Sequence, residues 1–333
     1  MRIAVVGAGA WGSAIAIHMA HQHEVVLWAR DPALADRLAT DRENKRYLPG
    51  FVFPENLQLE PVLGKALAKA GLWILAAPMV GLRTSLHAMR AQIETGRWPA
   101  LLWLCKGIEL DSGLLAHQIV DDVVPGIHAA ALSGPSFAQE TAAGLPVALV
   151  VASADGLCVP IARQALHHGA MRLYASRDVM GVELGGALKN VMAIAAGVCD
   201  GMGMGNNARA ALLTRGLAEM ARLGQRMGAQ VQTFMGLTGL GDLLLTATGA
   251  LSRNRQVGLA LARGEPTSQI LANLGHVAEG VSTAAVALDL AARHRVDMPI
   301  THAVHKLLTG ELNAPEALRQ LLARETRDEL DAC

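Results

Sequence analysis

The residue with the clearest capacity for acid–base chemistry is Lys189, because it is the only cation in a helical stretch, 179–198, that is made mostly of small and apolar residues. Lysine is rarely buried without a partner, and desolvation lowers the pKa of an unpaired ammonium group. Asp242, which follows a glycine-rich segment, is the natural partner, and Thr246 lies one helical turn farther on. Lys106, which follows an apolar run, is a second candidate cation. We predict a proton-transfer site from these residues, with ordinary solvated lysines as the alternative.

Two other segments contain residue types that bind anions. Ser252 is a good N-cap, and Arg253 in the first turn after it opposes the helix dipole unless an anion is present. A phosphate would supply that anion if free helix N–H groups, Asn254 and the guanidinium group held it. After another apolar run, Gly134 and Ser136 offer backbone and hydroxyl donors. A solvated helix cap is the alternative for the first segment.

The N-terminal glycines predict a dinucleotide site. Gly7, Gly9 and Gly12 have the spacing GxGxxG, directly after the apolar run Ile3–Val6 and before a helix of small residues over 13–20. A strand, a glycine turn and a helix in this order present backbone N–H groups to a pyrophosphate. The first glycine permits the tight turn, the second permits close approach of the phosphates, and the third permits close helix packing. We therefore expect a nicotinamide or flavin dinucleotide.

The end of the second predicted strand indicates which dinucleotide is preferred. Arg30 follows this apolar run, at the position where an arginine accommodates a 2′-phosphate and a carboxylate binds the ribose diol. Asp31 precedes Pro32 and is equally suited to cap the next helix, over 32–40. We expect NADP(H) to be preferred, with NAD(H) as the alternative.

These residues require two kinds of scaffold. Up to about residue 174, short apolar runs alternate with helical stretches, which predicts a mainly parallel sheet with functional groups at the C-terminal ends of its strands. The expected strands are 3–6, 24–28, 72–77, 100–104, 129–132, 147–152 and 171–174. The expected helices of the remaining chain are 179–198, 207–228, 252–263, 266–274, 280–294, 300–309 and 314–323. We predict an α/β fold with a dinucleotide-binding domain over 1–177 and an all-α substrate-binding and catalytic domain over 178–333.

Composition excludes several classes of partner. The chain of 333 residues is 52% apolar but only 3% aromatic, and its formal net charge is zero. Without a basic tract, nucleic acid and anionic membranes are not expected partners. No segment reaches about 18 uninterrupted apolar residues, and the chain begins in a predicted strand, so we expect neither membrane insertion nor a signal peptide.

Cysteine and histidine usage predicts a cytoplasmic protein without a metal. The four cysteines are scattered and have no CxxC spacing, which suits reduced thiols. The histidines do not combine with cysteines or acidic residues in a metal-ligand pattern. The low charge of the second half favours a homodimer.

Taken together, these motifs resemble one family over essentially the whole chain, the bacterial NAD(P)-dependent glycerol-3-phosphate dehydrogenases. The matching motifs are GAGAWG at 7–12, CKG at 105–107, SGPSFAQE at 133–140, GVELGGALKNVMAIAAG at 181–197, GLTGLGDLLLT at 236–246, SRNRQVG at 252–258 and VAEGVST at 277–283. Seven motifs in this order are very specific. The resemblance implies a Rossmann domain followed by a helical domain of the 6-phosphogluconate-dehydrogenase type. It also implies interconversion of dihydroxyacetone phosphate and sn-glycerol 3-phosphate, which feeds phospholipid synthesis.

The same resemblance implies roles for individual residues. Lys189 matches the catalytic proton donor and acceptor. The positions that match substrate contacts are Lys106, Gly134, Ser136, Asp242, Ser252, Arg253 and Asn254. The positions that match cofactor contacts are Ala10, Trp11, Arg30, Lys106, Ala138, Arg253, Val277 and Glu279, and Tyr47 is a further candidate. Cys105 and Ser136 stand where the family usually has threonine, and both keep a small side chain.

The implied mechanism follows from the charge that the reaction develops. Hydride addition to the C2 carbonyl of the substrate creates an alkoxide, which a protonated Lys189 can stabilise and protonate, while Asp242 orients the lysine. One alternative is another two-domain reductase, of the β-hydroxyacid dehydrogenase or ketopantoate reductase type, but those substrates carry a carboxylate rather than a phosphate. A non-catalytic NADP(H)-sensing protein is the other, although it would have no need of Lys189, Asp242 and Arg253 together.

Overall fold

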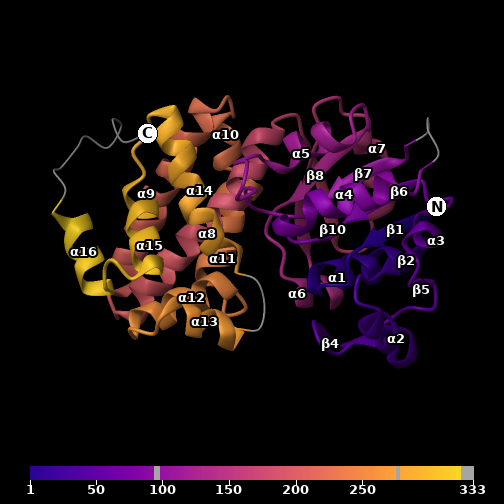
Figure 1. Ribbon diagram of the computed structural model, residues 1–333, viewed down its shortest axis with the longest axis horizontal. Helices are drawn as coiled ribbons and strands as arrows, with labels where there is room; N and C mark the ends of the chain where they lie inside the picture. The colour runs from indigo at the N-terminus through magenta and orange to yellow at the C-terminus, as the bar shows by residue number, and fades with distance from the viewer. Residues whose placement is uncertain (94–97, 275–277, 324–333) are drawn as a thin grey trace. The chain divides into compact units, whose positions relative to one another are not determined.

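The chain forms two compact units. The computed structural model describes residues 1–93, 98–274 and 278–323 (Figure 1). The first unit comprises Met1–Cys105 and Ala116–Val179, and the second comprises Lys106–Leu115 and Met180–Cys333. This division differs from the single boundary at 177/178 that the sequence predicts, because the chain crosses between the units three times. The segment 106–115 belongs to the second unit because Ile108 and Leu115 are buried in the helical core.

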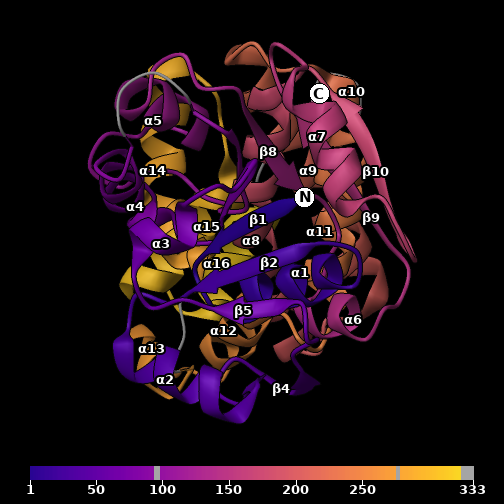
Figure 2. The ribbon, with the colours of Figure 1, turned by 90° about the vertical axis from the view of Figure 1, so that its right-hand side faces the viewer.

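An eight-stranded sheet forms the centre of the first unit, with the strand order β10-β9-β8-β7-β6-β1-β2-β5 (Figure 2). Its strands are β1 (Arg2–Val6), β2 (Glu24–Trp28), β5 (Leu57–Leu59), β6 (Leu72–Leu75), β7 (Ala100–Trp103), β8 (Ala129–Ser133), β9 (Val147–Ala152) and β10 (Met171–Ser176). All neighbouring strands pair in parallel except β8 and β9, which are antiparallel. The predicted mainly parallel sheet is therefore confirmed. The chain passes from β1 to β2 on one side and later returns to β6 on the other, so the end of β1 is a topological switch point, where such sheets bind ligands.

Short helices and a small second sheet complete the first unit. The helices are α1 (Ala10–Ala20), α2 (Pro32–Asp41), α3 (Leu63–Leu67), η1 (Met79–Gly81), α4 (Leu82–Arg90), α5 (Ala116–Val123), α6 (Ala138–Ala142) and α7 (Cys158–Leu166). Strands β3 (Glu43–Asn44) and β4 (Leu48–Val52) pair antiparallel. Strands β3, β4 and β5 were not predicted, because they are short and lack the continuous apolar runs of the buried strands.

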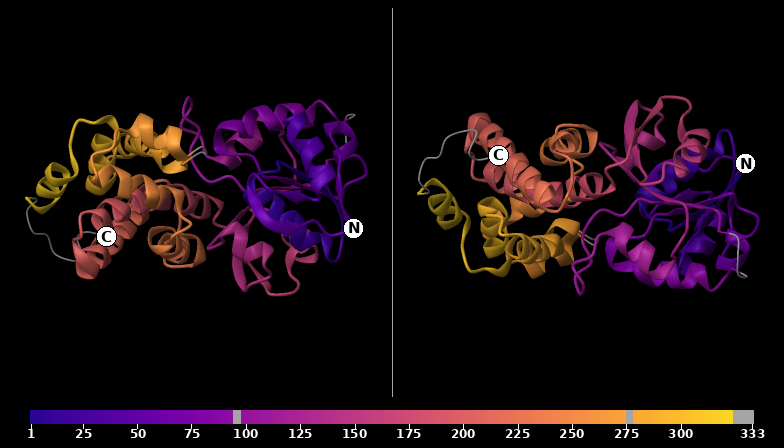
Figure 3. Two further views of the ribbon diagram at one scale, coloured as in Figure 1. Left: turned by 90° about the horizontal axis from the view of Figure 1, so that it is seen from below. Right: turned by 90° about the horizontal axis from the view of Figure 1, so that it is seen from above.

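In the described residues of the second unit, all the regular secondary structure is helical (Figure 3). Its helices are α8 (Val179–Gly201), α9 (Gly205–Arg226), α10 (Val231–Phe234), the π-helical turn η2 (Leu237–Gly241), α11 (Asp242–Thr248), α12 (Arg253–Ala262), α13 (Thr267–Leu274), α14 (Glu279–His294), α15 (Pro299–Thr309) and α16 (Ala314–Leu322). The predicted helices are confirmed to within a few residues at each end. The short elements α10, η2 and α11 were not predicted as helices of their own.

Helix α8 is the core of the second unit, and glycines let its neighbours approach closely. A side chain at Gly185 would place its Cβ 2.6 Å from the carbonyl oxygen of Thr238 in η2. A side chain at Gly258 would place its Cβ 2.0 Å from the carbonyl oxygen of Ile194, where α12 crosses α8. Among the described helices, α8 alone is long and apolar enough to cross a membrane by itself, and α10 to α12 would qualify only as one bent span. The apolar window of α8 is entirely buried in the unit, as in the core helix of a globular domain.

Candidate active site

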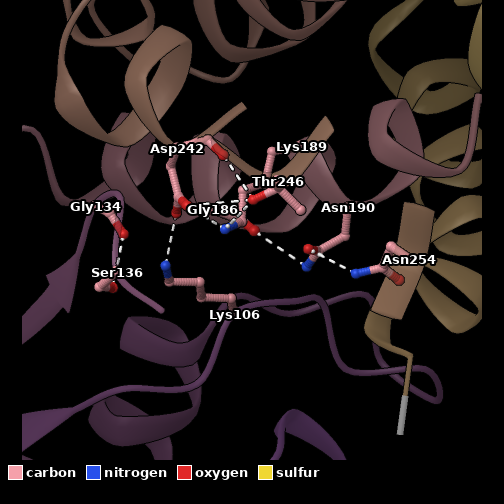
Figure 4. Close-up of polar contacts among 9 residues, drawn as sticks. All are labelled: Lys106, Gly134, Ser136, Gly186, Lys189, Asn190, Asp242, Thr246 and Asn254. Atoms are coloured by element: carbon pink, nitrogen blue, oxygen red, sulfur yellow. Dashed lines mark hydrogen bonds and ion pairs between the residues drawn. The ribbon is translucent and has the colours of Figure 1, made fainter. Parts of the chain in front are cut away.

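Two lysines share one buried carboxylate in the helical unit (Figure 4). The Nζ of Lys189 donates to Oδ1 of Asp242 and, over 2.9 Å, to the hydroxyl of Thr246. The Nζ of Lys106 donates to the other carboxylate oxygen, Oδ2, over 2.6 Å. The structure thus brings together the residues for which the sequence predicts proton transfer.

The local sequence explains how Asp242 reaches Lys189. Gly185 lies one helical turn before Lys189 on the same face of α8, and its missing side chain lets η2 pack directly on the helix. Asp242 is the first residue of α11, immediately after η2, so it faces α8 at this crossing. Thr246 lies one turn farther along α11 and donates its own proton to the Asp242 carbonyl over 2.6 Å, which leaves its oxygen to accept from Lys189.

Burial and charge oppose each other in this cluster. Asp242 is 1% exposed and Lys189 is 6% exposed. Burial, with repulsion from Lys106, lowers the pKa of Lys189 to about 7, although Asp242 acts to raise it. Burial alone would raise the pKa of Asp242, but the two ammonium groups outweigh this effect and lower it. With both lysines protonated the cluster has one excess positive charge, which favours a negative charge that develops on a bound ligand.

The start of α12 is tied to the helix that carries Lys189. Ser252 caps α12, and its hydroxyl accepts from the backbone N–H of Arg255 over 3.2 Å. The side-chain amide of Asn254 donates to Oδ1 of Asn190 over 2.9 Å and accepts from the N–H of Gly280 over 3.0 Å. Asn254 therefore links α12 to α8 and α14. This structural role was not part of the prediction, which made Asn254 a substrate contact.

Arg253 is exposed at the start of α12. Desolvation lowers the pKa of its guanidinium group, and the carboxylate of Glu279, in the first turn of α14, acts in the opposite direction. Glu279 therefore supplies part of the negative charge beside Arg253. The prediction from the sequence was that a bound anion alone would supply it. Val277, another predicted cofactor contact in this region, lies outside the described residues.

The glycine turn of the first unit fits a dinucleotide phosphate. Gly7 has φ +118°, and a Cβ on it would lie 2.7 Å from the carbonyl oxygen of Ala76. A Cβ at Gly12 would lie 2.0 Å from the Gly7 carbonyl oxygen, whereas one at Gly9 would meet open space. Helix α1 begins at Ala10 with no side-chain cap and no acidic residue in its first turn. No side chain of α1 therefore competes for the N–H groups of its first turn, as an anion site requires.

Other predicted cofactor contacts lie shortly after β1, β2 and β3 in the sequence. Arg30 is exposed just after β2. Asp31 caps α2, since its Oδ1 accepts from the N–H of Ala33 over 3.0 Å. Trp11 lies in the first turn of α1, and the Tyr47 ring lies under the guanidinium group of Arg46, 5.0 Å from its centroid.

The segment after β8 forms a tight turn in the first unit. Gly134 has φ +132°, and its carbonyl accepts from the hydroxyl of Ser136 over 3.0 Å. The Ser136 proton is therefore used within the turn, and a substrate oxygen that took this proton would replace the internal bond. Ala138 begins α6 directly afterwards.

Sequence reasoning missed several polar residues that support these sites. Asn190 could have been found from the sequence, because it is a polar residue next to Lys189 in a mostly apolar stretch. Asp200 accepts two hydrogen bonds from Arg255, of 3.0 and 2.7 Å, and one of 3.1 Å from Arg209, which fixes the first turn of α12 on α8 and α9. The sequence did not single out Asn44, because this residue lies outside every predicted helix and strand. Among the described residues, no group of three His, Cys, Asp or Glu side chains is arranged to hold a metal ion.

Comparisons with known proteins agree along the whole chain. The family model for the N-terminus of NAD-dependent glycerol-3-phosphate dehydrogenase matches residues 2–158, and the model for its C-terminus matches residues 178–319. Curated proteins named glycerol-3-phosphate dehydrogenase (NAD(P)+) from Burkholderia orbicola and Burkholderia lata are 53% and 52% identical, over 99% of this chain and 100% of each relative. The crystal structure of glycerol-3-phosphate dehydrogenase from Coxiella burnetii has a TM-score of 0.93 at 37% identity, covering 97% of this chain and 99% of that one.

Proposed function

Since this chain belongs to the NAD-dependent glycerol-3-phosphate dehydrogenase family, we propose that it interconverts dihydroxyacetone phosphate and sn-glycerol 3-phosphate with NAD(P)H. The observation that carries the proposal is the pair of lysines on Asp242. A buried ammonium group with a pKa of about 7 can both give and take a proton near neutral pH, as a reversible reaction requires.

The lysines act at the oxygen on C2 of the substrate. When bound, the reduced nicotinamide supplies the hydride that adds to C2. Lys189 donates a proton from Nζ to the carbonyl oxygen as negative charge develops there, and the neutral amine then regains a proton from solvent. Asp242 and Thr246 hold Nζ in place through both steps. Lys106 adds a second positive charge beside the carboxylate and so stabilises the developing alkoxide.

The phosphate of the substrate is proposed to bind at the start of α12. Ser252 caps the N-terminus of α12, and Arg253 offers its guanidinium group there. Asn254 connects this helix to Asn190, the residue that follows Lys189. Gly134 and Ser136 are proposed to offer a backbone and a hydroxyl donor to the substrate. Binding energy from the phosphate, which is remote from C2, then orients the reacting carbonyl.

The cofactor preference is also a proposal. Asp31 is engaged as the cap of α2, whereas Arg30 is exposed beside it, which supports NADPH over NADH. We further propose that the enzyme works as a homodimer in the cytoplasm and supplies glycerol 3-phosphate for phospholipid synthesis.

The decisive experiment measures loss of NADPH absorbance with a panel of ketones. The purified protein is mixed with dihydroxyacetone phosphate, unphosphorylated dihydroxyacetone, ketopantoate and a β-keto acid. We expect rapid turnover of dihydroxyacetone phosphate alone. Preferred turnover of a carboxylated ketone would assign the chain to another reductase class, and NADPH binding without turnover of any ketone would indicate a sensor.

A further inference from the structure

Asn44 is a fully buried polar side chain, 0% exposed, in the two-stranded sheet beside α1. Its Nδ2 donates to the carbonyl oxygen of Ala8 over 2.9 Å and to the hydroxyl of Ser13 over 2.8 Å. Its Oδ1 accepts from the N–H of Tyr47 over 3.1 Å. Both amide hydrogens and the amide oxygen are thus engaged, each by a different part of the dinucleotide-binding region.

The bond to Ala8 fixes the central peptide of the glycine turn. The peptide bond is planar, and this chain has no cis peptide among its described residues. In a trans peptide the C=O of Ala8 and the N–H of Gly9 point in opposite directions. Because Asn44 holds the Ala8 carbonyl, the Gly9 N–H is directed away from Asn44, and the open space beside Gly9 leaves room for a ligand there.

The other bonds of Asn44 hold the elements on either side of that peptide. Ser13 is itself 0% exposed in α1, so the shared hydrogen bond joins the helix to β3. The bond from Tyr47 fixes the turn between β3 and β4, where Arg46 lies over the Tyr47 ring. Figure 2 shows β4 on the same side of the sheet as α1. A single side chain therefore connects the glycine turn, α1 and the Tyr47 turn.

We propose that Asn44 is a positioning residue for the dinucleotide: it pre-orients the Gly9 amide toward the pyrophosphate and holds the Tyr47 turn at the same site. The inference rests on the proposed use of NAD(P)H but concerns binding alone, before any substrate is present. Ionised aspartate cannot donate to the Ala8 carbonyl, and alanine leaves three buried polar groups without this partner.

The test is a fluorescence titration of the full-length protein with NADPH in the absence of substrate, with N44A and N44D as the variants. We expect the Kd for NADPH to rise by about 10-fold or more in both, because a preorganised donor is lost. S13A keeps Asn44 but removes one of its acceptors, and we expect a rise of about 2- to 10-fold. This variant tests the proposal even if the Asn44 variants fail to fold.

N56A is the matched control, since Asn56 donates to the carbonyl of Ala20 at the opposite end of α1 over 3.4 Å. Its Kd should equal that of the wild type. Calorimetry of each unliganded variant separates a loss of stability from a loss of affinity. Folded N44A or S13A protein that binds NADPH as tightly as the wild type would overturn the inference. A wild-type protein that does not bind NADPH would instead refute the proposed function.

Discussion

Lys106 donates a hydrogen bond of 2.6 Å to Oδ2 of Asp242, the carboxylate oxygen that Lys189 does not use. One buried carboxylate thereby holds two ammonium groups whose positive charges repel each other. Its removal would leave two cations without their shared counterion, which is far more costly than the loss of an exposed ion pair. The arrangement makes the protonation of Lys189 sensitive to each of its neighbours, and the first two predictions follow from it.

Lys189→Met should lower kcat for dihydroxyacetone phosphate reduction by about 100-fold or more, because the proton donor is lost while Lys106 still pairs with Asp242. The Kd for NADPH should change little. Steady-state kinetics and a fluorescence titration measure the two quantities. Lys65→Met, at an exposed position on α3, is the control. Near-normal kcat in Lys189→Met would remove this lysine from the mechanism.

The two reaction directions should respond oppositely to pH. Reduction requires protonated Lys189, so its kcat/KM should fall as pH rises above about 7, whereas oxidation requires the neutral amine and should rise. The substrate phosphate titrates near pH 6, below this range. Lys106→Met removes a repelling charge and leaves Asp242 to Lys189 alone, so the pKa of Lys189 should increase. The decline in reduction should then move to higher pH, and an unmoved profile would contradict the coupling.

Arg253→Ala should reduce kcat/KM for dihydroxyacetone phosphate by about 10- to 150-fold, the range expected from loss of a charge-assisted hydrogen bond. Turnover of unphosphorylated dihydroxyacetone should change much less. Arg263→Ala, at the other end of α12, is the matched control because this arginine pairs with Glu265 at the surface. An equal loss with both substrates would show that Arg253 does not bind the phosphate.

Arg30→Ala should lower kcat/KM for NADPH much more than for NADH, because the 2′-phosphate loses its guanidinium partner. Rising salt should reduce the wild-type preference for NADPH, since the ion pair is exposed and screened. Arg37→Ala, an exposed arginine on α2, serves as the control. A wild-type enzyme that prefers NADH would refute this assignment of Arg30.

A histidine stack should make the first unit sensitive to acid. The rings of His18 and His168 lie parallel, with centroids 4.0 Å apart. Burial lowers the pKa of His18, and burial together with His18 lowers the pKa of His168 to about 4. Because both folded pKa values lie below the unfolded value of about 6.5, the unfolded chain binds more protons, and stability falls as pH decreases through this range.

Calorimetry should therefore show a lower unfolding temperature for the first unit at pH 5 than at pH 7.5. His168→Leu should weaken that dependence, because it removes one of the two groups that must be protonated. His302→Leu, an exposed position on α15 in the other unit, should leave the dependence unchanged. Equal acid sensitivity in the wild type and His168→Leu would exclude the stack as its cause.

Strongly patterned elements were predictable from local sequence. The bounds of β9 agree with its apolar run to the residue, and β2 has the predicted bounds 24–28 around the apolar run 25–28, because strands buried on both faces need continuous apolar side chains. The Lys189–Asp242 pair was predictable for a related reason, since a lone cation in an apolar helix requires a counterion. Strands β3 and β4 were not predictable, because the sequence of β4, LPGFV, contains a proline and a glycine and three of its five residues are exposed.

The sequence by itself determined the parallel sheet, the glycine turn, the helical second half and the pairing of Lys189 with Asp242, since apolar periodicity, backbone freedom and charge are properties of neighbouring residues. Only the tertiary structure decided that 106–115 packs with the helices and brings Lys106 to a residue 136 positions away. It alone also placed the Asn44 amide on the Ala8 carbonyl, 36 positions away. Such bonds depend on how close separate elements pack, and that distance follows from the volumes of all the side chains between them rather than from any local pattern.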